Sequence, residues 1–298
     1  MAAITEGISA RSWLFAPGDS ARKMEKAVAG PADIVLFDLE DAVAETEKPR
    51  ARSQVAAFLA AQPADRSRLW VRINPLQGPH ALADLEAIIS GRPGGIMLPK
   101  ARHGADVGRL HQHVSALEAA AGTDPGAIRV IALVTETAES MFTTGTYAGA
   151  PRLAALTWGA EDLADAVGAA SNRNADGSYA FLYEMARSFC LLGAAAAGVG
   201  AVETIYGDFR DEAGLRRRAH DARRSGFRGM LAIHPAQVEA INDAFTPTTG
   251  ELQAAQEIVD LFAANPAAGA IGHKGAMLDR PHLARAQALL RLARGKRP

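Results

Sequence analysis

The sequence contains only one cysteine, Cys190, which lies in an apolar segment. One cysteine cannot form an intramolecular disulfide, so we expect a buried packing residue and a cytoplasmic protein. The 32 Lys and Arg residues almost balance the 33 Asp and Glu residues, so no overall charge favours nucleic acid or a membrane surface. No apolar run approaches the ~18 residues of a membrane-spanning helix, and the N-terminus lacks the basic and apolar regions of a signal peptide.

The sequence also lacks several common catalytic motifs. It has no His-x-x-x-His or Cys-x-x-Cys pair for zinc, and no Gly-x-Ser-x-Gly turn for a serine nucleophile. It has neither the Gly-x-x-x-x-Gly-Lys-Ser/Thr loop of P-loop proteins nor a strand-linked Gly-x-Gly-x-x-Gly motif. These absences argue against a zinc enzyme, against covalent acyl transfer, and against the P-loop and dinucleotide-binding classes.

The sequence does have a regular alternation of short β-rich runs and longer Ala- and Leu-rich segments through residue 245. Eight strand signals, each followed by a helix signal, predict parallel βα units. Eight such units are typical of a (β/α)8 TIM barrel, whereas a doubly wound open sheet, the alternative, rarely needs eight. The predicted strands are 13–15, 34–37, 69–73, 95–98, 130–134, 153–157, 202–206 and 230–233, and the predicted helices are 21–29, 50–60, 81–89, 106–120, 140–146, 179–196, 214–225 and 235–242.

The remainder of the chain has a different pattern. The sequence TPTTG interrupts the alternation, residues 251–263 predict a helix, and a Gly-rich loop precedes a last helix after Pro281. We therefore expect a barrel domain of residues 1–245 and a C-terminal extension of residues 246–298. Such an extension would serve as a lid or as an arm exchanged between subunits. The simpler alternative is a disordered loop that joins two packing helices.

Polar residues follow nearly every predicted strand. In a (β/α)8 barrel the C-terminal ends of the strands meet at one end, which carries the active site. Asp38, Glu40 and Asp41 follow the second strand, Glu136 follows the fifth and Asp162 follows the sixth. Carboxylates without His or Cys partners suit a hard cation such as Mg2+ or Mn2+. The other strands bring Asp19, Arg72, Lys100, Asp208 and His234 to the same end.

Seven segments of the sequence are RSWLFAPGDSARKMEKA, DLEDAVAETEKPRAR, VRINP, GIMLPKAR, TETAES, WGAEDLADAVGA and GFRGMLAIHPAQ. They resemble, in this order, the blocks of the HpcH/HpaI aldolase and citrate lyase β-subunit (CitE-like) family, over residues 11–290. The resemblance implies a (β/α)8 barrel, in agreement with the strand count. It also implies a Mg2+-dependent lyase that cleaves or forms a carbon–carbon bond between an acyl-CoA and a 2-oxo acid, as citramalyl-CoA and malyl-CoA lyases do.

The resemblance also implies roles for individual residues. Glu136 and Asp162 match the two metal ligands, and Arg72 matches an arginine that contacts the 2-oxo acid. Asp279, in the extension, matches a general acid/base that relatives supply from a neighbouring subunit, which implies a homotrimer or homohexamer. The residues that match the CoA pocket are Phe15, Ala16, Lys26, Ile233 and His234.

With these ligands, the acids of the DLEDAV segment take a supporting role. We expect Glu40 and Asp41 to hold metal-bound water and to orient Arg72 or Lys100, while Asp38 is as easily structural. A lysine beside arginine and acids keeps a high pKa, so Lys100 is expected to form ion pairs rather than a Schiff base. The first helix carries a cationic strip, formed by Arg22, Lys23 and Lys26, which either binds CoA phosphates or is simply solvated. The sequence departs from the family at Glu203, where relatives commonly have aspartate.

Three other functions remain open at this point. The chain could be a CoA-independent 2-oxo acid aldolase, or the β subunit of a citrate lyase complex that acts on an acyl-carrier-protein thioester. It could also be a binding protein without catalytic activity. The GAMLDRP segment favours the acyl-CoA lyase, because simple hydroxy-oxo-acid aldolases commonly use metal-bound water or phosphate as the base. Every key position is intact, which argues against a silent protein.

Overall fold

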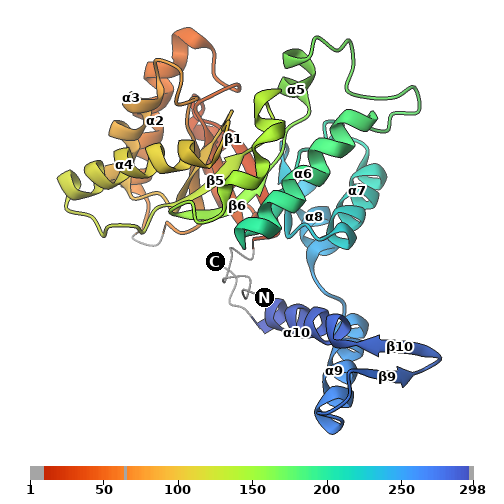
Figure 1. The fold of residues 1–298 in the computed structure, drawn as a ribbon. Coiled ribbons are helices and arrows are strands. Elements are labelled where there is room, and N and C mark those ends of the chain that lie inside the picture. The colour runs from red at the N-terminus through yellow and green to blue at the C-terminus, as the bar shows by residue number, and fades with distance from the viewer. Residues whose placement is uncertain (1–9, 64–65, 295–298) are drawn as a thin grey trace.

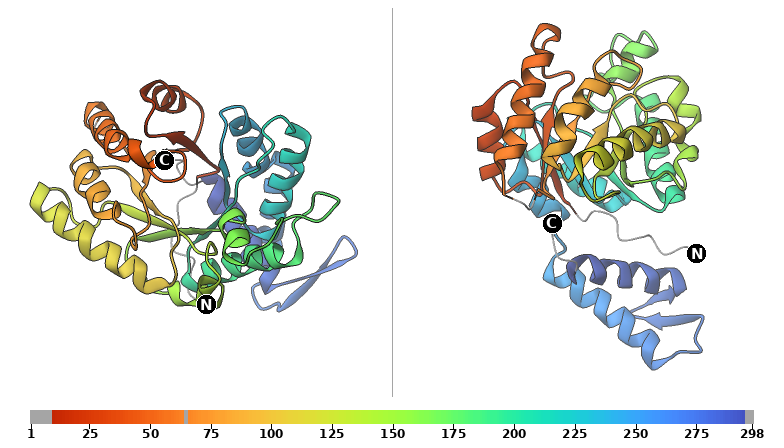
Figure 2. Two further views of the ribbon diagram at one scale, coloured as in Figure 1. Left: turned by 90° about the horizontal axis from the view of Figure 1, so that it is seen from above. Right: turned by 90° about the vertical axis from the view of Figure 1, so that its left-hand side faces the viewer.

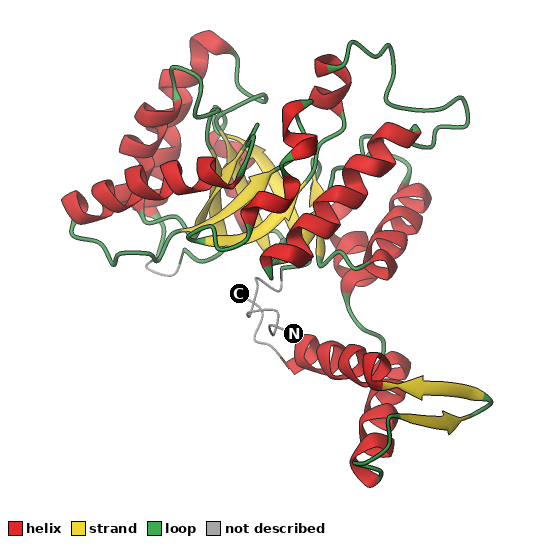
Figure 3. Cartoon of the chain, viewed as in Figure 1, coloured by secondary structure: helices red, strands yellow, loops and turns green. Residues whose placement is uncertain are grey.

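Eight parallel strands close into a barrel, because each strand pairs with the next along the chain and β8 pairs with β1. The computed structural model describes residues 10–63 and 66–294, so residues 1–9 and 295–298 of the two expected units lie outside the described residues. Helices surround the strands (Figure 3). The predicted (β/α)8 barrel is therefore confirmed. The strands are β1 (Ser12–Pro17), β2 (Ile34–Asp38), β3 (Leu69–Arg72), β4 (Gly95–Leu98), β5 (Arg129–Leu133), β6 (Leu153–Thr157), β7 (Gly200–Glu203) and β8 (Gly229–Ala232).

The strands are apolar on both faces because the barrel buries both faces. Trp13 and Ile34 belong to the core cluster inside the barrel, whereas Leu14 and Val35 pack in the cluster shared with the surrounding helices. Inside the barrel, the rings of Trp13 and Trp70 meet edge to face, with centroids 5.1 Å apart. This two-residue alternation explains why a continuous apolar run such as IVLF forms a strand here.

The helices of the barrel follow the predicted order, with boundaries that differ by a few residues. Cys190 is buried in α6, as expected. The short α5, directly after β6, was not predicted. The helices are α1 (Ala21–Ala29), α2 (Lys48–Ala61), α3 (Ala81–Ile88), α4 (Gly104–Ala121), α5 (Glu161–Ala166), α6 (Phe181–Ala197), α7 (Glu212–Ser225) and α8 (Gln237–Phe245), with the 3-10 helices η1 (Glu45–Glu47) and η2 (Ile89–Gly91).

The helix predicted over residues 140–146 is wrong. This stretch instead forms two short 3-10 helices, η3 (Glu139–Phe142) and η4 (Thr144–Tyr147). Ser140 donates from its hydroxyl to the carbonyl of Thr137 at 2.6 Å, and the Thr137 hydroxyl accepts from the Ser140 N–H at 3.2 Å. Side-chain hydroxyls that bond the nearby backbone compete with a continuous helix.

The extension consists of α9 (Thr249–Ala264), β9 (Ala270–His273), β10 (Ala276–Asp279) and α10 (Arg280–Arg294). The loop predicted before the last helix is wrong, because β9 and β10 form an antiparallel hairpin. Lys274 and Gly275 at its tip both have positive φ, as a two-residue hairpin turn requires. The pattern was missed because the strands are only four residues long and rich in Ala and Gly.

We call the end of the barrel where the strands end the mouth, and the end where they begin the floor. The extension lies beyond the floor, with α10 nearest the barrel (Figures 1 and 2). Just before β1, Arg11 donates to the Thr246 hydroxyl at 2.9 Å, which ties the start of the extension to the floor. Among the described residues, no helix is both long and apolar enough to cross a membrane.

Candidate active site at the barrel mouth

The ends of β2 and β3 carry a buried, two-pronged ion pair. Asp38 and Arg72 are directly paired in the register of these strands. The Arg72 guanidinium donates from Nε to Asp38 Oδ1 at 2.7 Å and from Nη2 to Oδ2 at 2.6 Å. Burial works against ionisation of Asp38, but Arg72 outweighs it and lowers the pKa of Asp38. Two parallel bonds fix the plane of the guanidinium and leave Nη1 directed toward Glu40.

Glu40 lies between the two cations of the mouth. Its carboxylate is 3.0 Å from Arg72 Nη1 and 2.9 Å from Lys100 Nζ. Burial raises the pKa of Glu40, although both cations oppose the rise. Its Oε2 atom makes no hydrogen bond with the described residues, because Arg72 approaches at a poor angle. Glu40 thus contacts both Arg72 and Lys100, and its role in orienting either of them stays a prediction.

Lys100 connects the ends of three strands. Its Nζ contacts Glu40 after β2 and also lies 3.0 Å from Asp162 Oδ1 after β6. These carboxylates raise the pKa of Lys100 despite partial burial, so the lysine is a cation and not a free amine. This agrees with the expected ion pairing. Asp41 lies at the edge of the group, more than half exposed, 3.5 Å from Arg72 and 3.9 Å from Lys100.

Glu136, after β5, is only 4% exposed and accepts from the backbone N–H of Lys100 at 2.6 Å. Lys100 has a positive φ of 48°, an uncommon conformation for a lysine and one often found at functional sites. Burial raises the pKa of Glu136 well above its ordinary value, and the carboxylates of Glu40 and Asp162 add to the rise. Gly159, just after β6, packs closely here, because a Cβ atom there would be 3.2 Å from Leu133 Cδ2 and 3.3 Å from Glu136 Cγ.

Glu136 and Asp162 fit a divalent cation. They come from adjacent strands, offer hard oxygen donors and repel each other, and that repulsion is what a bound cation relieves. In the described part of the chain, no group of three or more His, Cys, Asp or Glu side chains is placed to hold a metal. A two-carboxylate site suits Mg2+, which usually completes its shell with water and substrate oxygens. The Lys100 ammonium already neutralises part of the same acidic group.

A buried lysine that the sequence analysis missed supports the DLEDAV turn. Lys48, at the start of α2, donates from Nζ to the carbonyls of Leu39 and Glu40 at 3.2 and 3.0 Å and to Asn74 Oδ1 at 2.7 Å. Asn74 in turn donates to Asp84 Oδ2 at 2.7 Å. These bonds hold the backbone on which Glu40 is mounted. The only signal in the sequence was a lysine and an asparagine inside the matched segments.

Aromatic residues lie around the mouth. The Arg72 guanidinium is 4.8 Å from the centre of the Phe15 ring. Just after β8, which pairs with β1, the ring of His234 stacks on Phe209 with centroids 4.6 Å apart, and Ile233 beside it is exposed. Phe209, in the loop after β7, was not among the predicted site residues. Ala16 is buried in the core shared with the helices, so its side chain does not face the mouth.

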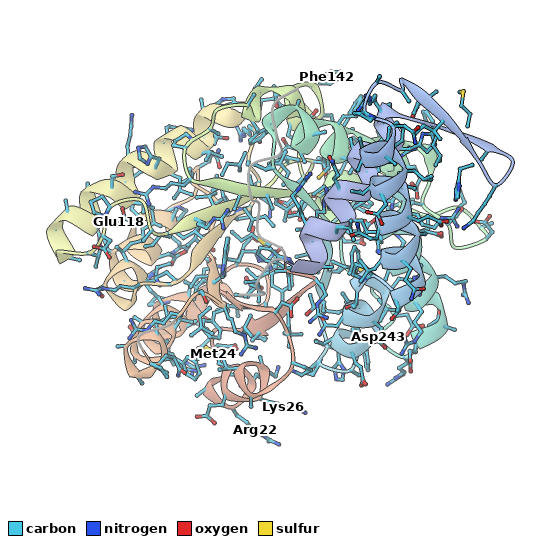
Figure 4. The ribbon with its side chains drawn as sticks, turned by 90° about the horizontal axis from the view of Figure 1, so that it is seen from below. Arg22, Met24, Lys26, Glu118, Phe142 and Asp243 are labelled. Atoms are coloured by element: carbon cyan, nitrogen blue, oxygen red, sulfur yellow. The ribbon has the colours of Figure 1, made fainter. Side chains whose placement is uncertain are left out.

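The cationic strip lies on the outer face of α1. Arg22, Lys23 and Lys26 are all exposed, whereas Met24 is buried against the barrel. In the view of Figure 4, Arg22 and Lys26 point away from the molecule and Met24 points into it. The strip is therefore accessible to a ligand. Because α1 begins a few residues after the end of β1, the start of the helix lies near the mouth.

Glu203, at the end of β7, is hydrogen-bonded to the residue that follows β6. Its carboxylate accepts from Trp158 Nε1 at 2.6 Å and from Arg187 Nε at 2.6 Å. Trp158 comes just before Gly159 and the start of α5, which carries Asp162. Glu203 thus reaches from the end of β7 to the tryptophan that follows the neighbouring strand β6.

Asp279 lies far along the chain from these residues, at the end of β10 and the start of α10 on the floor side (Figure 1). It is hydrogen-bonded to His282 Nδ1 and accepts from the His282 N–H at 3.3 Å. The bond with His282 lowers the pKa of Asp279. Among the described residues, no contact joins it to Arg72, Glu136 or Asp162.

A family model described as HpcH/HpaI aldolase/citrate lyase matches residues 11–235, well over half of the chain. The chain belongs to this family. A citrate lyase subunit beta-like protein of Mycobacterium tuberculosis is 37% identical over 281 residues, which cover 94% of each chain. The mitochondrial citramalyl-CoA lyase of Mus musculus is 33% identical over 295 residues, covering 95% of this chain and 86% of the other.

A solved structure of a family member agrees with the fold. The crystal structure of CitE from M. tuberculosis, in complex with magnesium, acetoacetate and coenzyme A, matches with a TM-score of 0.78 and 34% sequence identity. The match covers 96% of this chain and 98% of that one. The family resemblance read from the sequence is thus confirmed, and the chain is an enzyme of the lyase class.

Proposed function

We propose that this lyase acts, with Mg2+, on a β-hydroxyacyl-CoA such as citramalyl-CoA or malyl-CoA, and interconverts it with an acyl-CoA and a 2-oxo acid. The observation that carries the proposal is that Glu136 and Asp162 both contact Lys100 at the barrel mouth, where Glu40 connects Lys100 to Arg72. An acidic pair next to an immobilised guanidinium suits a dicarboxylate or 2-oxo acid bound together with a divalent cation.

The cation and Arg72 would both stabilise negative charge on the 2-oxo acid, each in a different way. Mg2+ held by Glu136 and Asp162 supplies Lewis-acid stabilisation of negative charge on the oxygens of the 2-oxo acid. Arg72 adds an N–H donor whose direction is fixed in advance by Asp38. Because Asp38 already holds the guanidinium, little reorganisation accompanies substrate binding.

Asp279 of a neighbouring subunit is proposed as the group that moves the proton at carbon. In the condensing direction it takes a proton from the carbon next to the thioester, and the resulting enolate carbon attacks the carbonyl carbon of the 2-oxo acid. The new alkoxide then takes up a proton, and cleavage runs through the same steps in reverse. The ionised carboxylate is the form that accepts a proton, and the hydrogen bond with His282 orients it.

The CoA part of the substrate has two candidate contacts. The exposed cations of α1, Lys26 among them, suit the phosphates. The stacked rings of Phe209 and His234, with Arg210 5.4 Å from the Phe209 ring centre, offer a flat surface for the adenine. These contacts favour a CoA thioester over a free 2-oxo acid pair.

The test is to incubate the protein with citramalyl-CoA, malyl-CoA and citryl-CoA in the presence of Mg2+ and to measure the release of pyruvate, glyoxylate and oxaloacetate. We expect turnover of at least one thioester, its loss with EDTA and its recovery with Mg2+ or Mn2+. Turnover of free citramalate or malate without CoA would instead identify a CoA-independent aldolase. Turnover that requires an acyl-carrier-protein thioester would identify a citrate lyase subunit.

Mixing two inactive variants tests the origin of Asp279. Asp279→Asn and Arg72→Ala should each be inactive alone, and mixed oligomers should regain part of the activity, because one mouth then receives both intact residues. Native mass spectrometry verifies that mixed oligomers form. If they form and stay inactive, the assignment of Asp279 to the neighbouring mouth is wrong.

A further inference from the structure

A second concentration of cations surrounds a cavity of about 650 Å3 at the floor, between the barrel and α10. The cavity is bordered by the residues before β1 and β8, by the end of α7 and by α10. A single acidic side chain, Glu251, lines it among the described residues. The cationic and titratable nitrogen side chains that line it are Arg11, His220, Arg223, Arg224, Arg228 and Arg285.

Only some of these cations are neutralised. Arg11 pairs with Asp33 at 2.8 Å, and Arg223 pairs with Glu251 at 3.0 Å. By contrast, the guanidinium groups of Arg228 and Arg285 make no hydrogen bond or ion pair with any residue in the described ranges 10–63 and 66–294. One of these two arginines belongs to the barrel and the other belongs to the extension.

Arg228 is in an environment that disfavours an unpaired charge. It is partly buried, and burial together with the neighbouring Arg291 guanidinium lowers the pKa of Arg228. A cation near like charges and away from water is stabilised by an anion, and the planar guanidinium matches the oxygens of a phosphate. Apolar side chains, including Phe245 and Leu289, form another part of the cavity wall.

We propose that this cavity is a binding site for a nucleoside diphosphate or triphosphate, with the phosphates between Arg228 and Arg285 and the base against the apolar wall. The cavity is large enough for a ligand of this class, since small-molecule sites commonly measure ~300–1,000 Å3. Because the barrel and α10 each provide a free arginine, the ligand would hold the extension against the floor. The site is separate from the mouth, where the cations are already paired with carboxylates.

The experiment titrates the intact protein with ADP and with pyrophosphate by calorimetry at low salt and in 0.5 M NaCl. We expect saturable binding that salt weakens and that is tighter for ADP than for pyrophosphate. Arg228→Met and Arg285→Gln should each weaken ADP binding at least tenfold. Arg217→Gln, at an exposed position of α7 outside the cavity, should change it less than twofold.

Lys26→Gln separates this site from the mouth, because an ADP bound by the cations of α1 would respond to that change. Binding that is lost in Lys26→Gln but kept in Arg228→Met would overturn the proposal. So would the absence of saturable binding to the wild-type protein, and equal affinities for ADP and pyrophosphate would overturn the nucleotide assignment. Arg285 is exposed, so its variant keeps the test valid even if Arg228→Met fails to fold.

Discussion

The charged groups of the mouth and the Arg152–Glu118 pair at the floor use the same kinds of side chain in opposite ways. At the floor, Arg152 makes a two-pronged pair with Glu118, with distances of 2.8 and 2.5 Å, and both side chains are buried. Arg152 also donates to Ser115 and to the carbonyl of Ile128. Nearly every donor and acceptor of this group is satisfied within the chain, as expected for a structural ion pair.

The mouth is not balanced in this way. Its two cations, Arg72 and Lys100, face a larger number of carboxylates, and Glu40 Oε2 has no hydrogen bond with the described residues. Burial and like charges raise the pKa of Glu136 well above its ordinary value. Such an arrangement costs stability in the isolated chain, and it is found where a ligand completes the electrostatics. The floor pair thus maintains the barrel, and the mouth is arranged for binding.

The largest expected effect is on activity, from a change at the mouth. Glu136→Gln should reduce metal-dependent turnover about a thousandfold or more, because a neutral amide is a poor ligand for Mg2+. The midpoint of thermal unfolding should stay the same or rise, since the substitution removes a buried carboxylate from among like charges. Glu139→Gln, an exposed neighbour in η3, is the control and should leave both quantities unchanged. A large loss of stability in Glu136→Gln would contradict the comparison.

A change to the Arg152–Glu118 pair should lower stability and leave activity unchanged, the opposite of the effect expected for Glu136→Gln. Arg152→Met leaves Glu118 buried and unpaired, which should lower the free energy of unfolding by about 3–5 kcal/mol while kcat/KM of the folded protein stays unchanged. Urea unfolding and steady-state kinetics measure the two effects. Adding Glu118→Leu should recover most of the lost stability, because the double variant has no unpaired charge. A double variant as unstable as the single one would show that the pair is not the cause.

Asp38 lies at the mouth but resembles the floor pair, because both of its carboxylate oxygens are hydrogen-bonded to Arg72. Its pKa is lower in the folded protein than in the unfolded chain, so its pairing with Arg72 stabilises the fold above pH ~4 and is lost as the pH falls through the folded pKa. Asp38→Asn should therefore cost about 1–3 kcal/mol at pH 7, and the difference from wild type should shrink below pH ~4. Urea unfolding between pH 3 and 7 tests this. A difference that does not vary with pH would mean that Asp38 is not ionised.

Sequence patterns were sufficient for the barrel because its strands are buried on both faces and carry unbroken apolar runs such as IVLF. They were also sufficient to bring Glu40, Arg72, Lys100 and Glu136 to one end, since parallel strands of a closed barrel all end there. They failed at η3 and η4, where local hydroxyl bonds replaced a helix, and at the β9–β10 hairpin, whose short strands carry no clear alternation.

The partners of individual polar groups were beyond the reach of the sequence for a different reason. Nothing in the spacing of Trp158 and Glu203, or of Arg228 and Arg285, indicates whether the chain brings them together. Such contacts depend on how loops and helices pack once the barrel has closed. The sequence therefore predicts which end of the barrel carries the active site, whereas the structure is needed to tell which cations at that end are already paired with carboxylates.

The smallest expected effect comes from Lys48, which supports the mouth without facing it. Lys48→Met keeps the aliphatic part of the side chain but removes the hydrogen bonds to the Leu39 and Glu40 carbonyls. The backbone that positions the Glu40 side chain is then held less firmly. We expect Mg2+ to bind about tenfold more weakly, as is common when an outer partner of a metal site is lost, with a smaller change in kcat. Direct Mg2+ titration measures this, with Arg50→Met, an exposed residue of the same helix α2, as the control. If Lys48→Met lowers the unfolding midpoint but leaves the Mg2+ affinity unchanged, then Lys48, like Arg152 and Glu118, only maintains the fold, and the mouth does not depend on this turn.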